Sequence, residues 1–479
     1  MGGTFIIGLV FLGYMVILVI IGLMASAKTN TEEDFFLGGR RIGTWVTAVS
    51  STASSESGWV ILGIIGLVYK EGLSSIWFMP GCLLGYWFNW RFIAPKLRVY
   101  SKNTAAITLP DLFEEELGDS GHSVRMVSVF IIFASMMGYV AAQFTAAAKA
   151  FHSTFSLDYN VSILIGATLV ILYTLMGGYR AVSWTDLFQG LLMVFALVIL
   201  PVVAVNHVGG IGALWNKLAP RGEFLSLVKG NAFWGSVGAV LGLLGIGFGY
   251  PGQPHVLQRF MAAEDDRVIQ RGKYIALSWG ALVYTGSIIL GLAGRVLIPE
   301  IADPEHVFPE LSKKLLHPAL SGLMLSAVMA SIMSTADSQL LVAASSVVRD
   351  VYEKMIGRRV GEKKLVLLSR LAVLVLGLLS IIVAITDIRA VFWFVLFAWA
   401  GLGAGFGPLV ILILRDYRFQ PRQAITGMLL GFSLTIIWKV SGMSAYLYEL
   451  VPSFLCSLLY LRVVGKKTVQ QDRGQVILD

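Results

Sequence analysis

The chain has 479 residues, of which 56% are hydrophobic and only 14% charged, and its formal net charge is +8. Soluble domains carry about 25% charged residues, so this composition excludes an ordinary soluble enzyme or binding protein. The lysines and arginines lie in short loops between apolar runs, where they set the orientation of membrane helices, and we expect no nucleic-acid partner. The sequence therefore predicts an all-α integral membrane protein in a lipid bilayer.

About thirteen apolar segments are long enough to cross a bilayer as transmembrane helices. In chain order they lie at 4–26, 45–69, 73–94, 124–151, 158–178, 184–208, 234–255, 273–298, 316–348, 364–385, 389–413, 420–440 and 445–464. With the N-terminus outside and the C-terminus in the cytoplasm, about 26 of the 37 lysines and arginines fall on the inner side. We therefore expect a multi-pass protein of a cell membrane, such as the bacterial inner membrane, in this orientation.

The second apolar segment is interrupted at its centre by VSSTASSESGWVILG, from Val49 to Gly63. Seven of the nine residues from Ser50 to Gly58 carry a hydroxyl or a charge. An acid within a membrane helix is costly and usually functional. We therefore expect Glu56 to face a cavity, an ion or a substrate.

Three polar features follow before residue 208. The amphipathic stretch TLPDLFEEE, from Thr108 to Glu116, predicts an interfacial helix on the inner side. Tyr139 and Gln143 lie one helical turn apart, which fits either contact with a substrate or a hydrogen bond between helices. Asp186 ends the sequence SWTD, which resembles a capping box, so it either stabilises a helix start or has a functional role.

A second interrupted segment reads GIGFGYPGQPH, from Gly245 to His255. Pro251 and Pro254 lack an amide proton and disfavour helix in the residue before them, so this segment cannot remain one continuous helix. Tyr250 and Gln253 present polar groups there.

The two breaks lie five segments apart, which indicates inverted repeats with a central binding site. The whole chain is then one transmembrane transporter domain. Its expected parts are an extra N-terminal helix and loop (4–44), a first repeat (45–208), an inverted second repeat (234–414), and C-terminal helices with a short tail (420–479).

A stripe of hydroxyl groups marks the segment at 316–348. Ser331, Ser334, Thr335 and Ser338 lie at positions i, i+3, i+4 and i+7, which is one face of a helix. Such hydroxyls can bond their own backbone or neighbouring helices, but four on one face favour an ion site. Na⁺ binds about five or six oxygens, and an unwound helix supplies carbonyls. The many neutral oxygens predict coupling to Na⁺ rather than to protons.

The remaining reactive residue types form no pattern of a catalytic site. Cys82 and Cys456 both fall in apolar runs and are expected to be small buried hydrophobic residues. The histidines show no metal-ligand spacing, and no Ser/His/Asp grouping or phosphate-binding loop stands out. We therefore do not expect an enzyme.

Motifs along nearly the whole chain resemble the sodium/solute symporters, and most closely their sodium/proline branch. They are FFLGGRRIG (35–43), SESGW (55–59), ITLPDLF (107–113), GGYRAVSWTDLFQ (177–189), GYPGQPHVLQRFMAA (249–263), MSTADSQLLVAASS (333–346), AWAGLGAGFGP (398–408) and IIWK (436–439). The resemblance implies about thirteen helices in a five-plus-five inverted-repeat transporter fold that imports a solute with Na⁺.

The resemblance also implies roles for particular residues. Oxygens of Ala53, Glu56, Ser331, Ser334 and Thr335 would bind the main Na⁺. Asp186 and Ser338 match a second sodium site that some members have. The positions matching the substrate site are Ser57, Gly58, Trp59, Tyr139, Gln143, Tyr250 and Pro254.

The chain departs from proline transporters within the expected cavity. Ser55 stands where an aspartate is expected, and the acid is the next residue, Glu56. Ile246 replaces an expected tryptophan, and Asp337 replaces a small neutral residue. The leading hypothesis is Na⁺-coupled import of proline or a related small amino or imino acid. The alternatives are a Na⁺ symporter for another small organic solute and a solute sensor, and the sequence specifies no oligomeric state.

Overall fold

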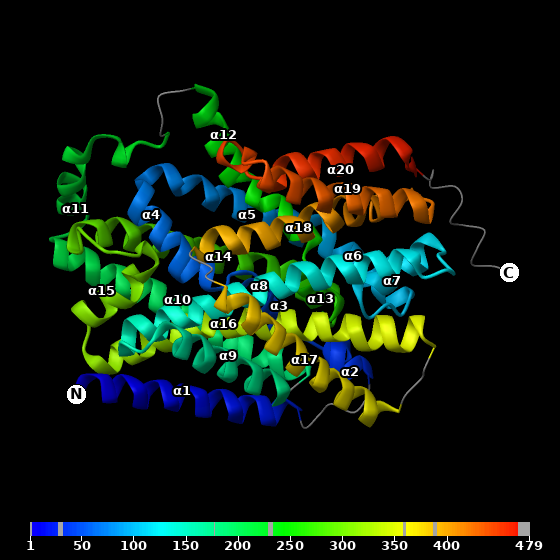
Figure 1. Ribbon diagram of the computed structural model, residues 1–479, viewed down its shortest axis with the longest axis horizontal. Coiled ribbons are helices and arrows are strands. Elements are labelled where there is room, and N and C mark those ends of the chain that lie inside the picture. Colours follow the sequence, from blue (N-terminus) through cyan, green and yellow to red (C-terminus); the bar gives the residue numbers. More distant parts are fainter. Residues whose placement is uncertain are drawn as a thin grey trace.

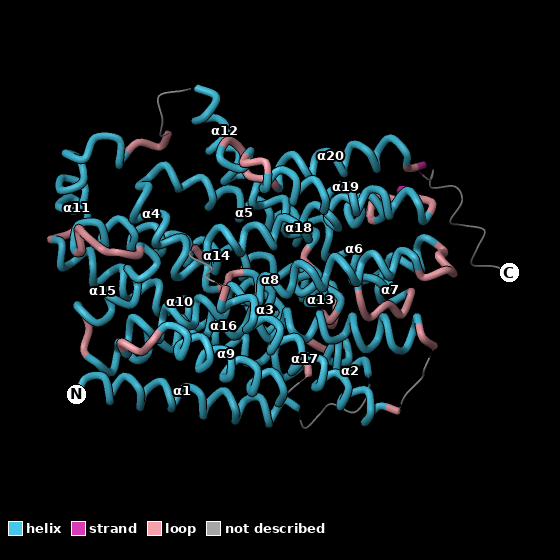
Figure 2. The backbone as a smooth tube through the Cα atoms, in the orientation of Figure 1, coloured by secondary structure: helices cyan, strands magenta, loops and turns pink. Residues whose placement is uncertain are grey.

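Helices make up almost all of the chain that the computed structural model describes, namely residues 2–26, 32–176, 178–228, 233–357, 361–386 and 390–467. Two short strands, β1 (Tyr417–Arg418) and β2 (Lys466–Lys467), pair antiparallel. Figure 2 shows this dominance of helix over strand. Helices satisfy their own backbone hydrogen bonds, which an apolar chain in lipid requires. The predicted all-α class is confirmed.

The α-helices are α1 (Gly2–Ser26), α2 (Glu32–Leu37), α3 (Thr44–Ser55), α4 (Ile65–Glu71), α5 (Phe78–Phe88), α6 (Ala94–Asn103), α7 (Leu109–Leu117), α8 (Ser123–Phe155), α9 (Tyr159–Met176), α10 (Tyr179–Val208), α11 (Ile211–Leu218), α12 (Phe233–Leu244), α13 (Pro254–Met261), α14 (Asp266–Leu297), α15 (Val307–Leu315), α16 (Pro318–Ser345), α17 (Glu362–Ile385), α18 (Val391–Ile413), α19 (Pro421–Val440) and α20 (Leu450–Val464). The 3-10 and π segments are η1 (Gly38–Arg40), η2 (Trp59–Ile64), η3 (Gly72–Trp77), η4 (Asn89–Ile93), η5 (Ala219–Leu225), η6 (Gly245–Gly252), η7 (Pro304–His306), η8 (Ser346–Met355) and η9 (Met443–Ala445).

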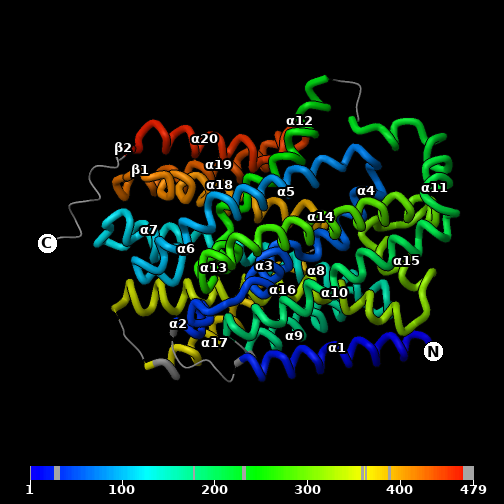
Figure 3. Tube along the Cα trace, turned by 180° about the vertical axis from the view of Figure 1, so that it is seen from behind, coloured from blue at the N-terminus to red at the C-terminus, as the bar shows by residue number. Residues whose placement is uncertain are grey.

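Most long helices run along the longest axis of the molecule (Figures 1 and 3). Helix α1 follows one long edge, and α19 and α20 follow the opposite edge. Helices α3, α8 and α16 lie between these edges, and α16 packs against α1, α8, α10 and α3. The interrupted helix α3 is therefore enclosed by its neighbours, with Val46 to Gly66 buried.

Ten helices in the described part of the chain are long and apolar enough to cross a membrane. Two shorter apolar helices, at Tyr159–Leu175 and Leu450–Val464, add to them. One span, Trp59–Asn103, contains parts of two expected segments, and its backbone turns at Gly72, where φ is 72°. The expected number of thirteen crossings stays a prediction.

Two helices extend beyond the apolar segments that predicted them. The segment expected at 73–94 continues as helix to Asn103, and the one expected at 316–348 continues to Met355. The charged residues there find partners: Lys96 Nζ donates to the Leu414 carbonyl at 2.7 Å, and Arg349 Nε donates to Asp111 at 2.9 Å. The charged residues end the apolar pattern of the sequence, and the predicted segments therefore stopped there. The helices continue because these charged side chains have hydrogen-bond partners.

Two further expectations concern single elements. The stretch from Thr108 forms helix α7 as predicted, and it begins with a capping box between Thr108 and Asp111. Its place on the inner side stays a prediction.

Cys82 is buried, as expected, but Cys456 is exposed on α20, so that prediction of burial was wrong. Apolar neighbours in sequence do not distinguish a side chain inside the bundle from one on its outer surface.

Candidate functional site

Helix α3 ends at Ser55, and helical structure resumes at Trp59 in η2. Glu56 at the end of α3 has φ −102° and ψ 80°, outside the helical region. Serine and threonine hydroxyls near this end bond to backbone carbonyls of their own turn: Ser55 Oγ donates to Thr52 O at 2.9 Å. Such local bonds compete with regular helix and favour its termination. The predicted break is present, and it lies in the buried centre of the molecule.

Four of the expected sodium ligands converge where α16 crosses the end of α3. The Ser334 hydroxyl lies 3.0 Å from the Ala53 carbonyl oxygen, and the Thr335 hydroxyl lies 3.4 Å from it. Both hydroxyls also lie within 3.3 Å of the Ser331 carbonyl oxygen. No hydrogen bond among the described residues links the Glu56 carbonyl to this group. The oxygen cluster therefore contains Ala53, Ser331, Ser334 and Thr335.

Gln143 from α8 binds the other side of the break. Its Oε1 accepts the Gly58 amide at 3.1 Å, and its Nε2 donates to Ser57 Oγ at 3.1 Å. The Trp59 indole donates to the Ser55 carbonyl at 3.2 Å. Tyr139, one turn before Gln143, places its hydroxyl near Ser57 but without a hydrogen bond to any described residue. Five of the expected substrate positions are therefore close together at the break, with Ser55 beside them.

The Glu56 side chain forms its hydrogen bonds within a group of tyrosines rather than with this glutamine. Its Oε1 accepts the Tyr86 hydroxyl at 2.7 Å and the Tyr250 hydroxyl at 2.8 Å. The Tyr284 hydroxyl lies 3.3 Å from that of Tyr250. Glu56 Oε2 has no hydrogen-bond partner among the described residues, and the side chain is fully buried. Glu56 therefore lies inside the protein against tyrosines, and its expected contact with a cavity, an ion or a substrate stays a prediction.

The second break brings Tyr250 to this site. The residues from Gly245 to Gly252 form the short helix η6, and α13 starts at Pro254. The Tyr250 ring lies 4.8 Å from the Trp399 ring and 4.7 Å from the Tyr86 ring, measured between centroids. Pro254 is buried at the start of α13, and no contact described here joins it to Glu56 or Gln143.

Asp186 lies inside α10 rather than at its start, so its interpretation as a capping residue was wrong. The helix begins at Tyr179, and the Ser183 hydroxyl donates to the Tyr179 carbonyl at 2.9 Å. The apolar pattern starts later than the helix because the first two turns, from Tyr179 to Asp186, mix polar with apolar residues, and only the turns after them are mostly apolar. Asp186 is therefore a buried acid in the middle of a membrane helix.

A buried arginine joins the two residues of the expected second sodium site. Arg259 from α13 donates to Asp186 Oδ2 at 3.1 Å and is also hydrogen-bonded to Ser338. Ser50 Oγ donates to the same carboxylate oxygen at 2.6 Å. Asp337 accepts the Ser338 hydroxyl at 3.2 Å, and its second oxygen has no partner in the described part of the chain. The Arg259 guanidinium, a cation of the protein itself, thus links Asp186 to Ser338.

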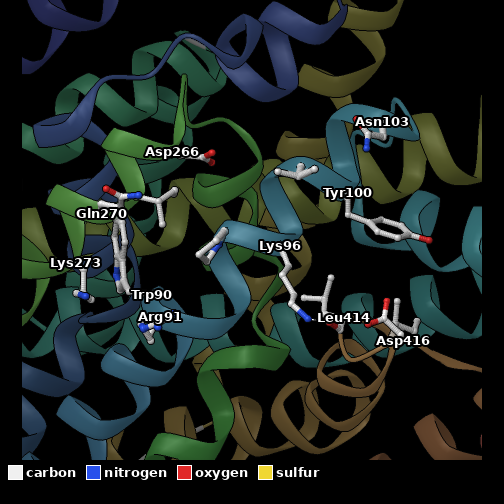
Figure 4. Close-up of a pocket in the computed structure, with 14 residues that line it drawn as sticks. Trp90, Arg91, Lys96, Tyr100, Asn103, Asp266, Gln270, Lys273, Leu414 and Asp416 are labelled. Atoms are coloured by element: carbon white, nitrogen blue, oxygen red, sulfur yellow. Dashed lines mark hydrogen bonds between the residues drawn. The ribbon is translucent and has the colours of Figure 1, made fainter. Parts of the chain in front are cut away.

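Two cavities are relevant to this site, one beside the first turns of α14 and one beside Asp303 and Glu305, which follow α14 in the chain. One, of about 730 Å³, is lined by Asp266 and Gln270 in the first turns of α14 and by Lys96, whose ammonium points to Leu414 (Figure 4). The other, of about 690 Å³, is lined by Gly63, Ile246, Glu305 and Phe392, among other residues. The 32 residues of α14 span about 48 Å at 1.5 Å per residue. The candidate site lies between the two cavities.

The site is closed from both cavities. Glu56, Ser57, Gln143 and Tyr250 are all 0% exposed. On the side of the second cavity, the Trp59 ring lies against the Phe392 ring at 6.0 Å between centroids. The structure therefore represents an occluded arrangement.

Sequence reasoning missed Tyr86, Tyr284 and Arg259, which surround the buried acids. One signal was available: each acid in a membrane helix requires a hydrogen-bond donor or a cation, and Arg259 is a basic residue in an otherwise buried segment. The two tyrosines lie in ordinary apolar runs, and nothing in the spacing distinguishes them from packing residues.

A family model described as the sodium:solute symporter family matches residues 35–431. The high-affinity proline transporter PutP of Bacillus subtilis is 37% identical, covering 96% of this chain and 98% of that protein. The sodium/proline symporter of Escherichia coli is also 37% identical, over 93% and 90% of the two chains.

The solved structures similar to this one share its fold. A Na⁺-coupled sialic acid symporter in a substrate-bound outward-open state superposes with a TM-score of 0.80 at 18% identity, covering 97% of this chain and 99% of that one. The nucleobase-cation-symport-1 transporter MHP1, in a closed conformation, gives 0.54 at 11% identity, with coverage of 91% and 96%. The expected transporter fold is confirmed.

The matched family and relatives are transporters, so the prediction that the chain is not an enzyme is confirmed. The many apolar helices make it a multi-pass membrane protein. Because the family model covers most of the chain and full-length relatives are more than a third identical, the chain belongs to the sodium:solute symporter family.

Proposed function

We propose that the protein imports proline, or a related small amino or imino acid, together with Na⁺. The observation that carries this proposal is the convergence of the Ala53 and Ser331 carbonyls with the Ser334 and Thr335 hydroxyls. These are hard, neutral oxygens, as Na⁺ requires. The names of the full-length relatives support proline as the solute.

The position of this oxygen cluster explains how Na⁺ would promote solute binding. Ala53 lies at the end of α3, immediately before the break, whereas Ser334 and Thr335 belong to α16. An ion held by all of them ties the two helices together and fixes the residues that follow the break, from Glu56 to Trp59. Na⁺ then raises the affinity for the solute, and by linkage the solute raises the affinity for Na⁺.

Asp186 and Ser338 remain our candidates for a second sodium site, subject to one condition. Arg259 now binds both of them. Arg259 occupies Asp186 Oδ2, whereas Asp186 Oδ1 has no hydrogen-bond partner among the described residues. A second Na⁺ would bind Oδ1, and the condition is that the Arg259 guanidinium moves far enough to reduce the repulsion between the two cations and to free the Ser338 hydroxyl.

The transport cycle that we propose uses the two repeats, 45–208 and 234–414, as units that rock about the central site. The cavity lined by Phe392 then opens to the outside, and the cavity lined by Lys96 opens to the cytoplasm. This assignment keeps the N-terminus outside and the C-terminus inside a bacterial plasma membrane.

Uptake of radiolabelled proline into liposomes that contain the purified protein tests this function. An inward Na⁺ gradient should drive accumulation, and replacing Na⁺ with K⁺ or choline should abolish it. A proton gradient without Na⁺ should give only the background of protein-free liposomes. Equal uptake in that arm would contradict Na⁺ coupling, and absence of uptake with Na⁺ would contradict proline as the solute.

A further inference from the structure

Glu56 is the one fully buried carboxylate at the break of α3, and only one of its two carboxylate oxygens accepts hydrogen bonds from the part of the chain that the structure describes. Three hydroxyls donate to its Oε1, from Tyr86 at 2.7 Å, from Tyr250 at 2.8 Å and from Ser55 at 3.5 Å. Its Oε2 accepts no hydrogen bond from any described residue. A buried carboxylate oxygen without a partner is costly, so this oxygen is suited to a ligand that donates to it.

The charge of Glu56 is also unbalanced. No lysine, arginine or histidine among the described residues lies within ion-pair distance of its carboxylate, and only hydroxyl groups contact it. Asp186, another buried acid of this region, has Arg259 as its counter-ion. An ionised carboxylate in a membrane interior requires a cation, and at Glu56 the protein does not supply one.

Aromatic rings complete the surroundings of this carboxylate. The Tyr86 and Tyr250 rings lie at 4.7 Å between centroids, the Tyr284 ring is 6.5 Å from that of Tyr86, and Trp399 lies beyond Tyr250. Tyr86 and Tyr250 direct their hydroxyls to the carboxylate and bring no charge of their own, so a protonated amine is the ligand that this carboxylate is suited to bind. Tyr250 is itself one of the proposed substrate residues, so this carboxylate adjoins that site.

We propose that the Glu56 carboxylate binds the protonated amine of the transported solute, with the tyrosines around it forming the wall of that subsite. The solutes accepted are then small amino or imino acids with a cationic nitrogen. Neutral solutes and simple carboxylates of the same shape are excluded. This inference rests on the proposed function and names the chemical group that the site selects.

A sodium ion is the competing occupant, and the geometry favours the amine. Na⁺ needs about five or six oxygens. At Glu56 the other oxygens are phenol groups and the Ser55 hydroxyl, and the hydroxyls of Tyr86, Tyr250 and Ser55 already direct their protons to the carboxylate. The neutral oxygens around Ala53 and Ser334 form the more suitable sodium site.

The first test uses the unaltered protein and analogues of proline in Na⁺-driven uptake. Tetrahydrofuran-2-carboxylate keeps the ring and the carboxylate but has oxygen in place of the ammonium. N-methylproline keeps the positive charge. We expect the oxygen analogue to compete at least about tenfold more weakly than proline, since a charged hydrogen bond is lost, and N-methylproline to compete better than the oxygen analogue.

The second test compares Glu56→Gln with Glu56→Asp and with Glu300→Gln, a control at an exposed acid. Glu56→Gln keeps the shape and removes the charge, so the proline concentration for half-maximal uptake should rise about 10- to 100-fold at saturating Na⁺. Glu56→Asp should recover part of this loss, and Glu300→Gln should match the unaltered protein. Thermal unfolding of each variant, with and without Na⁺, reports whether it folds.

The outcomes separate this inference from the proposed function. If proline uptake requires Na⁺ but the oxygen analogue competes as well as proline, the amine receptor is wrong and the symporter stands. If Glu56→Gln changes only the Na⁺ concentration needed, Glu56 is a sodium ligand and the inference is overturned. If no Na⁺-driven proline uptake occurs in the unaltered protein, the proposed function itself fails.

Discussion

Gly58 has space for a hydrogen atom and for nothing larger. A Cβ at this position would lie 2.8 Å from the Ala146 Cβ, 3.2 Å from Ile332 and 3.4 Å from Gln143 Oε1. All three neighbours belong to the closely packed helices α8 and α16. The residue therefore lets two helices approach the broken end of α3 while its amide stays bonded to Gln143.

Gly58→Ala should separate these helices and weaken both ligand sites. We expect a loss of about 1–3 kcal/mol in stability, typical of overpacking, and proline uptake reduced at least tenfold. Gly13→Ala is the matched control, because a Cβ there meets no atom within 4 Å. Thermal unfolding and uptake would be measured for both variants, and equal behaviour of the two would contradict the role of close packing at Gly58.

Ser334 contributes an oxygen to the proposed sodium cluster, and its replacement tests that cluster directly. Ser334→Ala should raise the Na⁺ concentration for half-maximal uptake several-fold, about the effect of losing one favourable ligand contact. Ser326→Ala on the same helix is the control, because its hydroxyl bonds only the Gly322 carbonyl at 2.8 Å. The Na⁺ dependence of uptake would distinguish them, and an unchanged dependence in Ser334→Ala would remove Ser334 from the site.

The elements of the fold were largely predictable because their signals are local. Proline and glycine at 245–255 predicted the second break, and the serines before Glu56 predicted the first. The hydroxyl stripe on α16 was visible from helical spacing alone. What local pattern could not supply was the pairing between distant elements: Arg259 with Asp186, 73 positions apart, and Tyr86 with Glu56. Such pairs depend on how helices pack, which no short stretch of sequence determines.

An ionic cluster joins α7, α8 and η8 near one end of the molecule. Arg125 contacts Glu114 at 2.7 Å and Asp111 at 2.8 Å, and it also contacts Asp350. Burial alone would raise the pKa of Glu114, but hydrogen bonds from Arg125 and His122 outweigh it and hold the pKa below its ordinary value. The ionised form of Glu114 is therefore favoured in the folded protein.

This shift predicts how acid affects the stability of the cluster. A carboxyl with a lowered folded pKa stabilises the protein above its unfolded pKa, and this stability is lost as the pH falls through the folded pKa. Glu114→Gln should therefore be less stable than the unaltered protein at pH 7, and the difference should shrink progressively below about pH 4.5. Thermal unfolding across pH 3–7 in detergent measures this, and a constant difference would contradict it.

The whole molecule is closed at its centre and open toward both ends, as alternating access requires of an intermediate. On the side of Phe392, a second cluster of ion pairs keeps the site closed. Lys149 from α8 binds Asp303 and Glu305, each at 2.6 Å, and Glu305 accepts the backbone amides of Val391 and Phe392 at 3.1 and 3.0 Å. The start of α18 is thereby tied to α8, with the Phe392 ring against Trp59.

Lys149→Met should loosen this tie, because Asp303 and Glu305 would repel each other without the ammonium between them. We expect the outward-open form to increase about tenfold relative to the closed form. A single cysteine at Ile246, which lines the adjoining cavity, should then react faster with a membrane-impermeant maleimide. Lys313→Met is the control, since Lys313 pairs with Glu310 instead, and equal labelling in both variants would argue against the tie.

The reactivity of Cys82 offers a way to measure how often the closed centre of the molecule opens. The thiol is buried on α5, one turn before Tyr86, and within the electrostatic reach of Glu56. Because the thiol is fully buried, we expect a small alkylating reagent to reach it when the site opens, and the rate of reaction should then measure how often the molecule opens. With Cys456 replaced by serine, Na⁺ and proline together should slow the alkylation of Cys82 followed by mass spectrometry. If neither Na⁺ nor proline changes the rate of alkylation, the thiol lies outside the part of the molecule that opens and closes.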